Sequence, residues 1–179
     1  LRNNWEVAVS KPLDVLLVTP PSRVQVYQEL SRDFAAIEPP VWSGLIATFL
    51  RQHSCSVAIL DAEAEGLNHQ QTADRIAAIA PRLAVFVIYG QQPSASTQCM
   101  PAGRKVCEIL TALADIPTLV MGTHPSALPK RTLLEEPYTY VCQGEGPATI
   151  LGLVIALRAP QHSLREVPGL WHMEKGVPV

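Results

Sequence analysis

Five short runs of apolar, largely β-branched residues restrict the fold of this sequence more than any other feature. Most of them are apolar at nearly every position, which is typical of strands that a parallel sheet buries on both faces. The runs lie at residues 14–19 (DVLLVT), 56–61 (SVAILD), 83–89 (LAVFVIY), 117–121 (PTLVM) and 138–142 (YTYVC). Segments with a helical spacing of apolar residues separate them. The sequence therefore predicts five buried parallel strands connected by helices.

The clearest helical segment runs from residue 39 to 53. It starts with two prolines, which a first helical turn tolerates, and then repeats apolar residues at helical spacing. Further helices are expected at residues 68–80, 100–114, 126–135 and 147–157. Strand-helix-strand units with right-handed crossovers give an α/β fold. We expect a doubly wound, five-stranded parallel sheet of the flavodoxin-like (Rossmann-like) kind, with strand order 2-1-3-4-5.

Composition excludes several classes of protein. At 179 residues the chain is long enough for one α/β domain and short for two. Apolar residues make up 47% and charged residues 17%, which excludes disorder. The net charge of -2 gives no electrostatic support for binding nucleic acid or an anionic membrane. No run approaches the about 20 residues of a membrane span and no signal peptide is recognisable, so we expect a cytoplasmic protein.

Familiar catalytic and metal-binding motifs are missing from the sequence. The four cysteines match no zinc or iron-sulfur spacing and are expected as reduced thiols in or near the core. The hydrolase, zinc-protease and phosphate-loop motifs do not occur. In place of the dinucleotide-binding motif, TPPS follows the first run, and its two prolines remove backbone donors. These observations argue against NAD or FAD, and we predict no catalytic residue and no metal ligand in this chain.

The loops that follow the predicted strands carry glycines and short polar side chains. In sheets of this class, ligands bind beyond the carboxyl ends of the strands. The loop at residues 20–38 is unusually long, and later loops read GQQPSAST at 90–97, GTHPS at 122–126 and QGEGP at 143–147. This rim suits a large polar ligand that many neutral hydrogen bonds hold and that glycines allow to approach closely.

The end of the sequence has a different pattern. Residues 167–177 (VPGLWHMEKGV) predict a hairpin with its turn near residues 174–176 and with no partner for its last strand. We therefore divide the chain into an N-terminal extension (1–13), a domain (14–157), and a linker with the start of a hairpin (158–179). We also expect the natural polypeptide to continue beyond Val179 as part of a larger protein.

Five segments, in this order and spacing, resemble one family. DVLLVTPPS, PPVWSGLIATFLR, ILD, MGTHPSALP and CQGEGPATI resemble the N-terminal cobalamin (B12)-binding domain of cobalamin-dependent radical SAM enzymes of the methyltransferase type. VPGLWHMEKG resembles the connector to their catalytic barrel. The resemblance implies that methylcobalamin bound here delivers a methyl group to a substrate radical. S-adenosylmethionine and a 4Fe-4S cluster would belong to a downstream radical SAM domain, whose CxxxCxxC motif is not in this sequence. Ring formation and ring contraction also occur in the family.

The resemblance also implies which residues contact cobalamin. They follow the first, third, fourth and fifth predicted strands: Thr19, Pro20, Pro21, Ser22, Tyr89, Gly90, Gln91, Ser94, Ser96, Thr97, Gly122, Thr123, His124, Ser126, Gly144, Glu145 and Gly146. Gly144 and Gly146 can adopt positive φ or admit a ligand, although an ordinary turn before a helix explains both as well. We expect a bulky side chain at Gly122 or Gly144 to weaken cobalamin retention without unfolding the domain.

The identity of the lower cobalt ligand stays open. Related cobalamin proteins carry a D-x-H-x-x-G motif whose histidine ligates cobalt, whereas residues 1–50 of this chain contain no histidine. The dimethylbenzimidazole base is then expected to be displaced, with the metal five-coordinate or water-bound. We expect His124 to bond a neighbouring loop. Tyr89, Gln91 and Gln92 are candidates for the position beneath the cobalt, although a Tyr89 that fills the end of the sheet fits equally well.

Three side chains near the expected site have two interpretations each. Trp42 is predicted to lie in the core because of its helical spacing, and shielding of the corrin edge is the alternative. Arg23 and Arg32 are expected as solvated loop charges, and contact with a corrin phosphate or propionamide is the alternative.

The alternative function of the chain is that of a non-enzymatic flavodoxin-like ligand-binding or receiver module. A receiver needs an acidic cluster at the strand ends, and the first strand supplies none.

Overall fold

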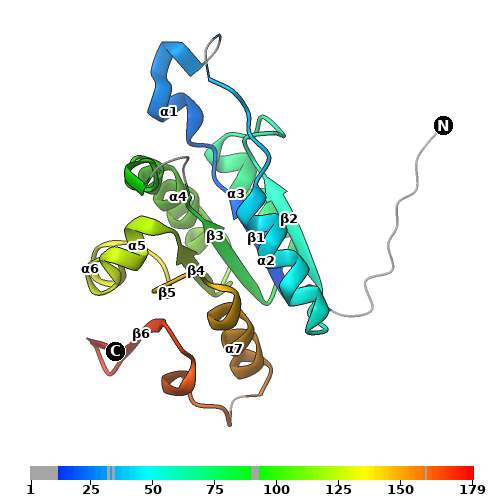
Figure 1. The fold of residues 1–179 in the computed structure, drawn as a ribbon, viewed down its shortest axis with the longest axis vertical. Helices are drawn as coiled ribbons and strands as arrows, with labels where there is room; N and C mark the ends of the chain where they lie inside the picture. The colour runs from blue at the N-terminus through cyan, green and yellow to red at the C-terminus, as the bar shows by residue number, and fades with distance from the viewer. Residues whose placement is uncertain (1–11, 32, 34, 90–92, 160) are drawn as a thin grey trace, which may run out of the picture.

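The computed structural model describes residues 12–31, 33, 35–89, 93–159 and 161–179, which form one sheet with helices on both faces (Figure 1). The strands are ordered β2-β1-β3-β4-β5-β6-β7. The first five pair in parallel, which confirms the α/β class and the order 2-1-3-4-5. They are β1 (Val15–Thr19), β2 (Val57–Asp61), β3 (Leu83–Val87), β4 (Thr118–Met121) and β5 (Tyr140–Cys142).

The C-terminal hairpin extends this sheet, so the described strands number seven and not the predicted five. β6 (Leu170–Glu174) pairs antiparallel with β5, and β7 (Val177–Pro178) pairs antiparallel with β6. The predicted hairpin is present, but its first strand lies beside β5. The pattern of a hairpin shows that two strands pair with each other, and it carries no information about the sheet edge that they join.

Helices cover both faces of the sheet. α2 (Val41–Gln52) and α7 (Pro147–Arg158) pack on one face, in a core cluster with Leu17 and Val85. α3 (His69–Ile79), α4 (Pro93–Leu113) and α6 (Pro129–Glu135) cover the opposite face, in a second cluster with Phe86. Because both faces are covered, β3 is buried at every position, as its continuous hydrophobicity predicts.

The bounds of two helices differ from the prediction. α4 begins at Pro93, seven residues before the expected start, because the polar loop after β3 folds into the first helical turns. The segment expected as one helix at residues 126–135 forms two helices, α5 (Thr123–Ala127) and α6. The helical conformation is interrupted at Leu128, directly before Pro129. A short 3-10 turn, η2 (Leu164–Glu166), precedes β6. Within the described residues, no helix combines the length and apolar character needed to cross a membrane.

A largely buried carboxylate ties together elements at the amino ends of the strands. Asp14 directly precedes β1 and accepts hydrogen bonds from the Ser56 backbone N–H at 2.8 Å and from its hydroxyl at 2.7 Å. Arg158, at the end of α7, forms an ion pair with Asp14 at 2.6 Å. Burial raises the pKa of Asp14, but the hydrogen bonds from Arg158 and Ser56 outweigh this effect and lower that pKa from 3.8 to about 2. These contacts join β1, β2 and α7 at the amino edge of the sheet, opposite the loops that follow the parallel strands.

The Asp14→Asn variant is expected to lower the free energy of unfolding by about 2 kcal/mol near neutral pH, since one pKa unit is worth about 1.4 kcal/mol. Because the pKa of Asp14 is lower in the folded than in the unfolded protein, the carboxylate stabilises the fold above about pH 4. That contribution is lost as the pH falls towards 2. Urea denaturation followed by circular dichroism should show the two proteins converging over this range. Glu65→Gln, in an exposed ion pair, is the control. A difference independent of pH would contradict the prediction.

Candidate functional site

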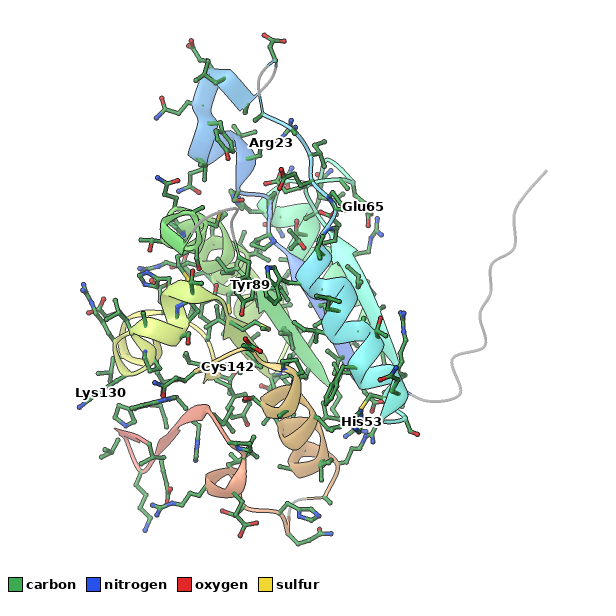
Figure 2. All side chains as sticks on the ribbon, in the orientation of Figure 1. Arg23, His53, Glu65, Tyr89, Lys130 and Cys142 are labelled. Carbon is green, nitrogen blue, oxygen red and sulfur yellow. The ribbon has the colours of Figure 1, made fainter. Side chains whose placement is uncertain are left out.

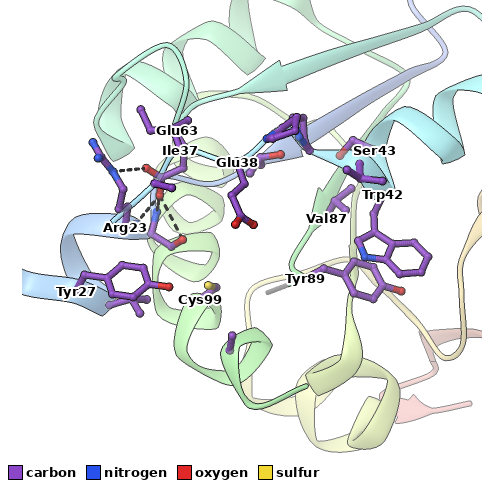
Figure 3. A pocket seen from close by; sticks show the side chains of 18 residues that line it. Arg23, Tyr27, Ile37, Glu38, Trp42, Ser43, Glu63, Val87, Tyr89 and Cys99 are labelled. Carbon is purple, nitrogen blue, oxygen red and sulfur yellow. Dashed lines mark hydrogen bonds and ion pairs between the residues drawn. The ribbon is translucent and has the colours of Figure 1, made fainter. Parts of the chain in front are cut away.

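A cavity of about 380 Å³ lies at the carboxyl ends of β1 and β3 (Figure 3). One wall is the segment between β1 and α2, which we call the arm. Its outgoing limb is residues 20–31 and its returning limb is residues 35–40. The start of α2, the end of β3 and the first turns of α4 complete the lining. The cavity therefore lies at the sheet edge where ligands of doubly wound folds bind.

The arm contains a short helix where the sequence predicts only a long loop. α1 (Arg23–Tyr27) is followed by a 3-10 turn, η1 (Gln28–Ser31). No α1 residue is buried, and Val24 and Tyr27 are 69% and 45% exposed. Figure 1 shows α1 projecting beyond the sheet. Apolar packing of α1 therefore contributes little to holding the arm in place.

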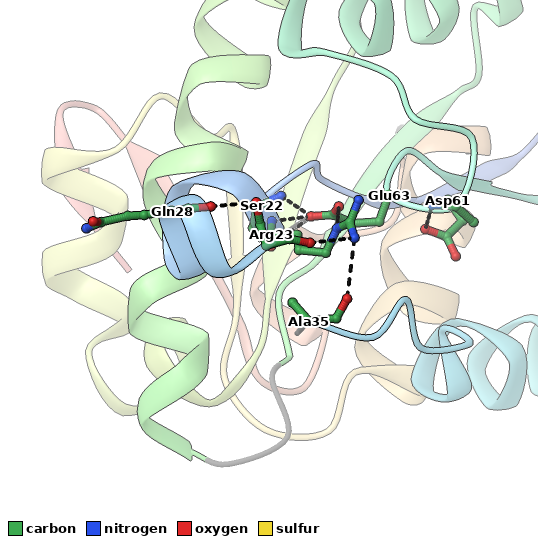
Figure 4. A network of polar contacts seen from close by, with 8 residues as sticks. Ser22, Arg23, Gln28, Ala35, Asp61 and Glu63 are labelled. Atoms are coloured by element: carbon green, nitrogen blue, oxygen red, sulfur yellow. Dashed lines mark hydrogen bonds and ion pairs between the residues drawn. The ribbon is translucent and has the colours of Figure 1, made fainter. Parts of the chain in front are cut away.

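Polar contacts hold the arm against the body of the protein (Figure 4). The Glu63 carboxylate, from the loop after β2, accepts hydrogen bonds from the backbone N–H groups of Ser22 and Arg23. The Arg23 guanidinium donates to the carbonyl of Ser31 at 3.0 Å and lies 3.7 Å from Glu63. Arg23 is thus engaged within the arm, which neither interpretation from the sequence anticipates. Arg32 lies outside the described residues.

Trp42 and Tyr89 stack at the cavity wall, with ring centroids 4.8 Å apart and planes inclined by 21° (Figure 3). The prediction that Trp42 lies in the core is wrong, since this side chain is 44% exposed. The buried face of α2 instead contains Ser43, Ile46, Ala47 and Leu50. The apolar stripe of α2 is wider than the face that packs on the sheet, so its periodicity did not show which side turns inward.

Tyr89 connects the cavity to the loop after β5. Burial raises the pKa of the Tyr89 phenol, and the negative charge of Glu145 acts in the same direction. Tyr89 also lines the cavity with Val87, at the end of β3. Tyr89 also packs against the core cluster that contains Cys142 (Figure 2).

Two hydroxyl groups of the cavity lining have no hydrogen-bond partner among the described residues. They are Ser43 Oγ, on a side chain that is 0% exposed, and Thr19 Oγ1, at the end of β1. Burying a hydroxyl without a partner costs free energy unless a ligand or a water molecule supplies the bond. Sequence reasoning found Thr19 but missed Ser43, although a serine amid the apolar positions of a helix was a usable signal.

Another side chain of the lining, Cys99, is not an activated nucleophile. Burial raises the pKa of its thiol, and the nearby Glu63 charge acts in the same direction, against a hydrogen bond from Ser22. A raised pKa leaves the thiol protonated near neutral pH. The cavity lining thus offers hydrogen bonds and aromatic surface to a ligand.

The loops after β3 and β4 are held together by a buried hydroxyl. Ser96 Oγ donates to the Ile88 carbonyl at 2.6 Å and accepts from the His124 backbone N–H at 3.1 Å. The His124 ring bonds the Thr97 hydroxyl at 2.9 Å, so this histidine ties two loops together. Gly122 permits the close approach, because a Cβ at its φ of +149° would overlap the Ile88 carbonyl oxygen.

The loop after β5 is joined to the loop after β4 in the same way. The backbone N–H of Gly144 donates to Ser126 Oγ at 2.8 Å. Gly144 and Gly146 both adopt positive φ, +106° and +95°. A side chain at Gly146 would overlap Met121, whereas a Cβ at Gly144 meets nothing within 4 Å. The open space at Gly144 makes it the better candidate for close contact with a ligand.

The residues expected from the resemblance therefore fall into two neighbouring groups. Thr19, Ser22 and Tyr89 line the cavity. A second group lies beyond β3, β4 and β5, on the first turns of α4, on α5 and in the loop after β5, and comprises Ser96, Thr97, Gly122, Thr123, His124, Ser126, Gly144, Glu145 and Gly146. Pro20 and Pro21 are the first two residues of the arm. Gly90 and Gln91 lie outside the described residues, as does the side chain of Ser94.

The glycines of the second group are expected to differ in their effect on stability. Gly122→Ala should lower the free energy of unfolding by about 2 kcal/mol or more, because backbone atoms must move and strained positions are costly. Gly144→Ala should cost only about 1 kcal/mol, for the unfavourable φ alone. Urea denaturation of both variants measures the difference. Equal losses would contradict this geometry. For Gly122, the overlap with the Ile88 carbonyl argues against our expectation that a bulky side chain leaves the fold intact.

Comparison with known proteins identifies the class of this fold and site. Residues 30–154 match the model of the family described as the B12 binding domain. The match spans more than half of the chain, and the protein belongs to this family, whose cofactor is cobalamin. A search of curated proteins found no match.

Two solved structures have a similar fold. TsrM from Kitasatospora setae, a radical S-adenosylmethionine methyltransferase with cobalamin and a 4Fe-4S cluster bound, superposes with a TM-score of 0.71 at 17% identity, over 94% of this chain and 28% of that chain. OxsB, a cobalamin-dependent S-adenosylmethionine radical enzyme with aqua-cobalamin and S-adenosylmethionine bound, gives 0.69 at 17% identity, over 94% and 22%. The present chain spans less than a third of the length of either enzyme.

Proposed function

We propose that this chain holds cobalamin at the carboxyl edge of its sheet for a cobalamin-dependent radical SAM methyltransferase. One observation carries the proposal: the cavity at this edge is lined by two buried hydroxyls, Ser43 Oγ and Thr19 Oγ1, for which the described part of the chain offers no hydrogen-bond partner. A bound ligand that satisfies both recovers the free energy that their burial costs. Membership of the B12-binding family gives the ligand its identity.

The two groups of site residues suit different parts of cobalamin. The corrin ring carries many amide side chains, which need hydrogen-bond partners, and the segments after β3, β4 and β5 offer these at Thr97, His124 and Glu145. The cavity suits the nucleotide end, because a planar base can pack against the aromatic rings of Trp42 and Tyr89 while polar atoms reach Ser43. Gly144 gives the ligand room beside the backbone.

The residues of this chain would bind and orient the cofactor. Cobalamin, when bound, supplies a cobalt-centred carrier for a methyl group. The stacked rings of Trp42 and Tyr89 offer an aromatic surface at the cavity wall, and the buried Ser96 contacts fix the loops before the ligand arrives. S-adenosylmethionine and a 4Fe-4S cluster would be held by a further, radical SAM domain of the same polypeptide, reached through residues 158–179, in the cytoplasm.

The residues after β2 do not favour the receiver alternative. Asp61 Oδ1 accepts a hydrogen bond from the Ala64 backbone N–H, and Glu63 is engaged by the arm. A receiver needs neighbouring acids free to act together at the strand ends. Both acids here have local structural partners.

The first test is retention of cobalamin. The purified chain should be mixed with hydroxocobalamin, desalted, and examined by visible absorption. We expect stoichiometric co-elution of corrinoid with the protein peak, and a spectrum without the features of a histidine-ligated cobalt. A colourless peak from folded protein, as judged by circular dichroism, would overturn the proposal for this chain.

Comparison of cobalamin with cobinamide, which lacks the nucleotide, tests the role of the cavity. Ser43→Ala is expected to raise the Kd for cobalamin about 3- to 10-fold, the effect of one lost hydrogen bond, and to leave the Kd for cobinamide unchanged. Thr48→Val is the matched control, since Thr48 lies on the same helix, is exposed, and bonds the Gly44 carbonyl. The apoprotein of Ser43→Ala should be at least as stable as the wild type, because the lost hydroxyl bonds none of the residues that the structure describes. Equal effects on both corrinoids would place the nucleotide elsewhere.

A further inference from the structure

Glu63 joins the arm to the rest of the protein through several contacts at once. It lies in the loop after β2, and its Oε1 atom accepts hydrogen bonds from the Ser22 and Arg23 backbone N–H groups. The Ser22 hydroxyl donates to the same atom at 3.3 Å. These donors begin α1, whose first turn has no capping bond from its own N-cap side chain. Glu63 therefore fixes the start of the outgoing limb.

The same carboxylate holds the returning limb through Arg23. The second carboxylate oxygen lies 3.7 Å from Arg23 Nε. Arg23 Nη1 in turn donates to the carbonyl oxygens of Ser31 at 3.0 Å and Ala35 at 3.4 Å. Figure 4 shows the guanidinium close to Glu63, with its hydrogen bond to the Ala35 carbonyl of the returning limb. One acid and one base thus connect β2 with both limbs of the arm.

The other described contacts of the outgoing limb hold it less firmly than Glu63 and Arg23 do. None of the α1 residues is buried, and the exposed Leu30 lies in the 3-10 turn that follows. Hydrogen bonds that involve a charged group are about twice as strong as neutral ones, and the carboxylate and guanidinium remain partly shielded from water, at 18% and 28% side-chain exposure. The position of the arm therefore depends mainly on Glu63 and Arg23.

The position of the arm sets the shape of the cavity. Val26 and Tyr27 of the outgoing limb and Ile37 of the returning limb all line it, as do Arg23 and Glu63 themselves. Figure 3 shows Arg23 and Glu63 on the side of the cavity opposite the stacked Trp42 and Tyr89. If the limbs moved outward, the cavity would widen on that side and lose part of its lining.

We propose that Glu63 is a positioning residue, which holds both limbs of the arm at the distance that the cavity needs to retain the nucleotide end of cobalamin. The inference rests on the proposed function. Glu63 acts on the ligand through Ser22 and Arg23, so it changes how long cobalamin stays bound and leaves recognition of the corrin ring to the loops after β3, β4 and β5.

The test compares Glu63→Gln with Glu65→Gln. Glutamine keeps the shape of the side chain and removes the charge. Glu65 lies two residues away and pairs with Arg75 at 3.3 Å on the exposed surface, outside the cavity lining, which makes it the matched control. In Glu63→Gln we expect faster hydrogen exchange of apoprotein peptides from residues 20–31 and about tenfold faster release of cobalamin. Release of cobinamide should not change.

The outcomes separate the two proposals. If the wild-type chain binds neither corrinoid, the proposed function is wrong. If it binds cobalamin and Glu63→Gln matches Glu65→Gln in release rate, the inference about Glu63 is wrong while the function stands. Faster release of both corrinoids would also overturn the inference about Glu63, since the effect would then lie outside the nucleotide cavity.

Arg23→Lys is a second variant, which keeps the positive charge but not the paired donors of the guanidinium. Hydrogen exchange should therefore rise mainly in the two limbs of the arm, while the far-UV circular dichroism spectrum stays unchanged.

Discussion

Parallel pairing of β1, β3, β4 and β5 is the constraint on which the rest of the site depends. Parallel strands start at one edge of the sheet and end at the other, so loops far apart in sequence meet at the carboxyl edge. The register aligns Val87 with Met121, and the loops that follow then lie close enough for Ser96 to bridge Ile88 and His124. The Asp14 contacts tie β1, β2 and α7 together at the opposite edge.

Different interactions stabilise the two parts of the site, the loops after β3, β4 and β5 and the arm. The loops after β3, β4 and β5 are fixed by buried hydrogen bonds and by a glycine that admits no side chain, so their geometry is set before any ligand binds. The arm instead depends on a partly exposed ion pair and its hydrogen bonds, and none of the α1 residues is buried. A segment of this kind opens at lower free-energy cost than the core, as binding segments must.

The sequence was sufficient for the parts of the fold that depend on local pattern. Continuous apolar runs predicted the five parallel strands and their order, because such runs have few alternatives in a chain of this composition. The sequence was insufficient for features that depend on contacts between residues far apart in the chain. The pairing of β6 with β5, the turn of α2 that exposes Trp42, and the contact of Glu63 with the arm all join residues whose spacing carries no periodic signal.

Sequence reasoning also could not separate residues that build the site from residues that face the ligand. Serine, threonine and glycine serve both purposes with the same chemistry. Ser96 is fully buried and spends its hydroxyl on two backbone groups, so it shapes the loops, whereas Ser43 is equally buried and has no described protein partner. The difference lies in the partner of one oxygen atom, which only the folded structure reveals. A buried hydroxyl that lacks a partner is therefore better evidence for a ligand contact than any short motif at the strand ends.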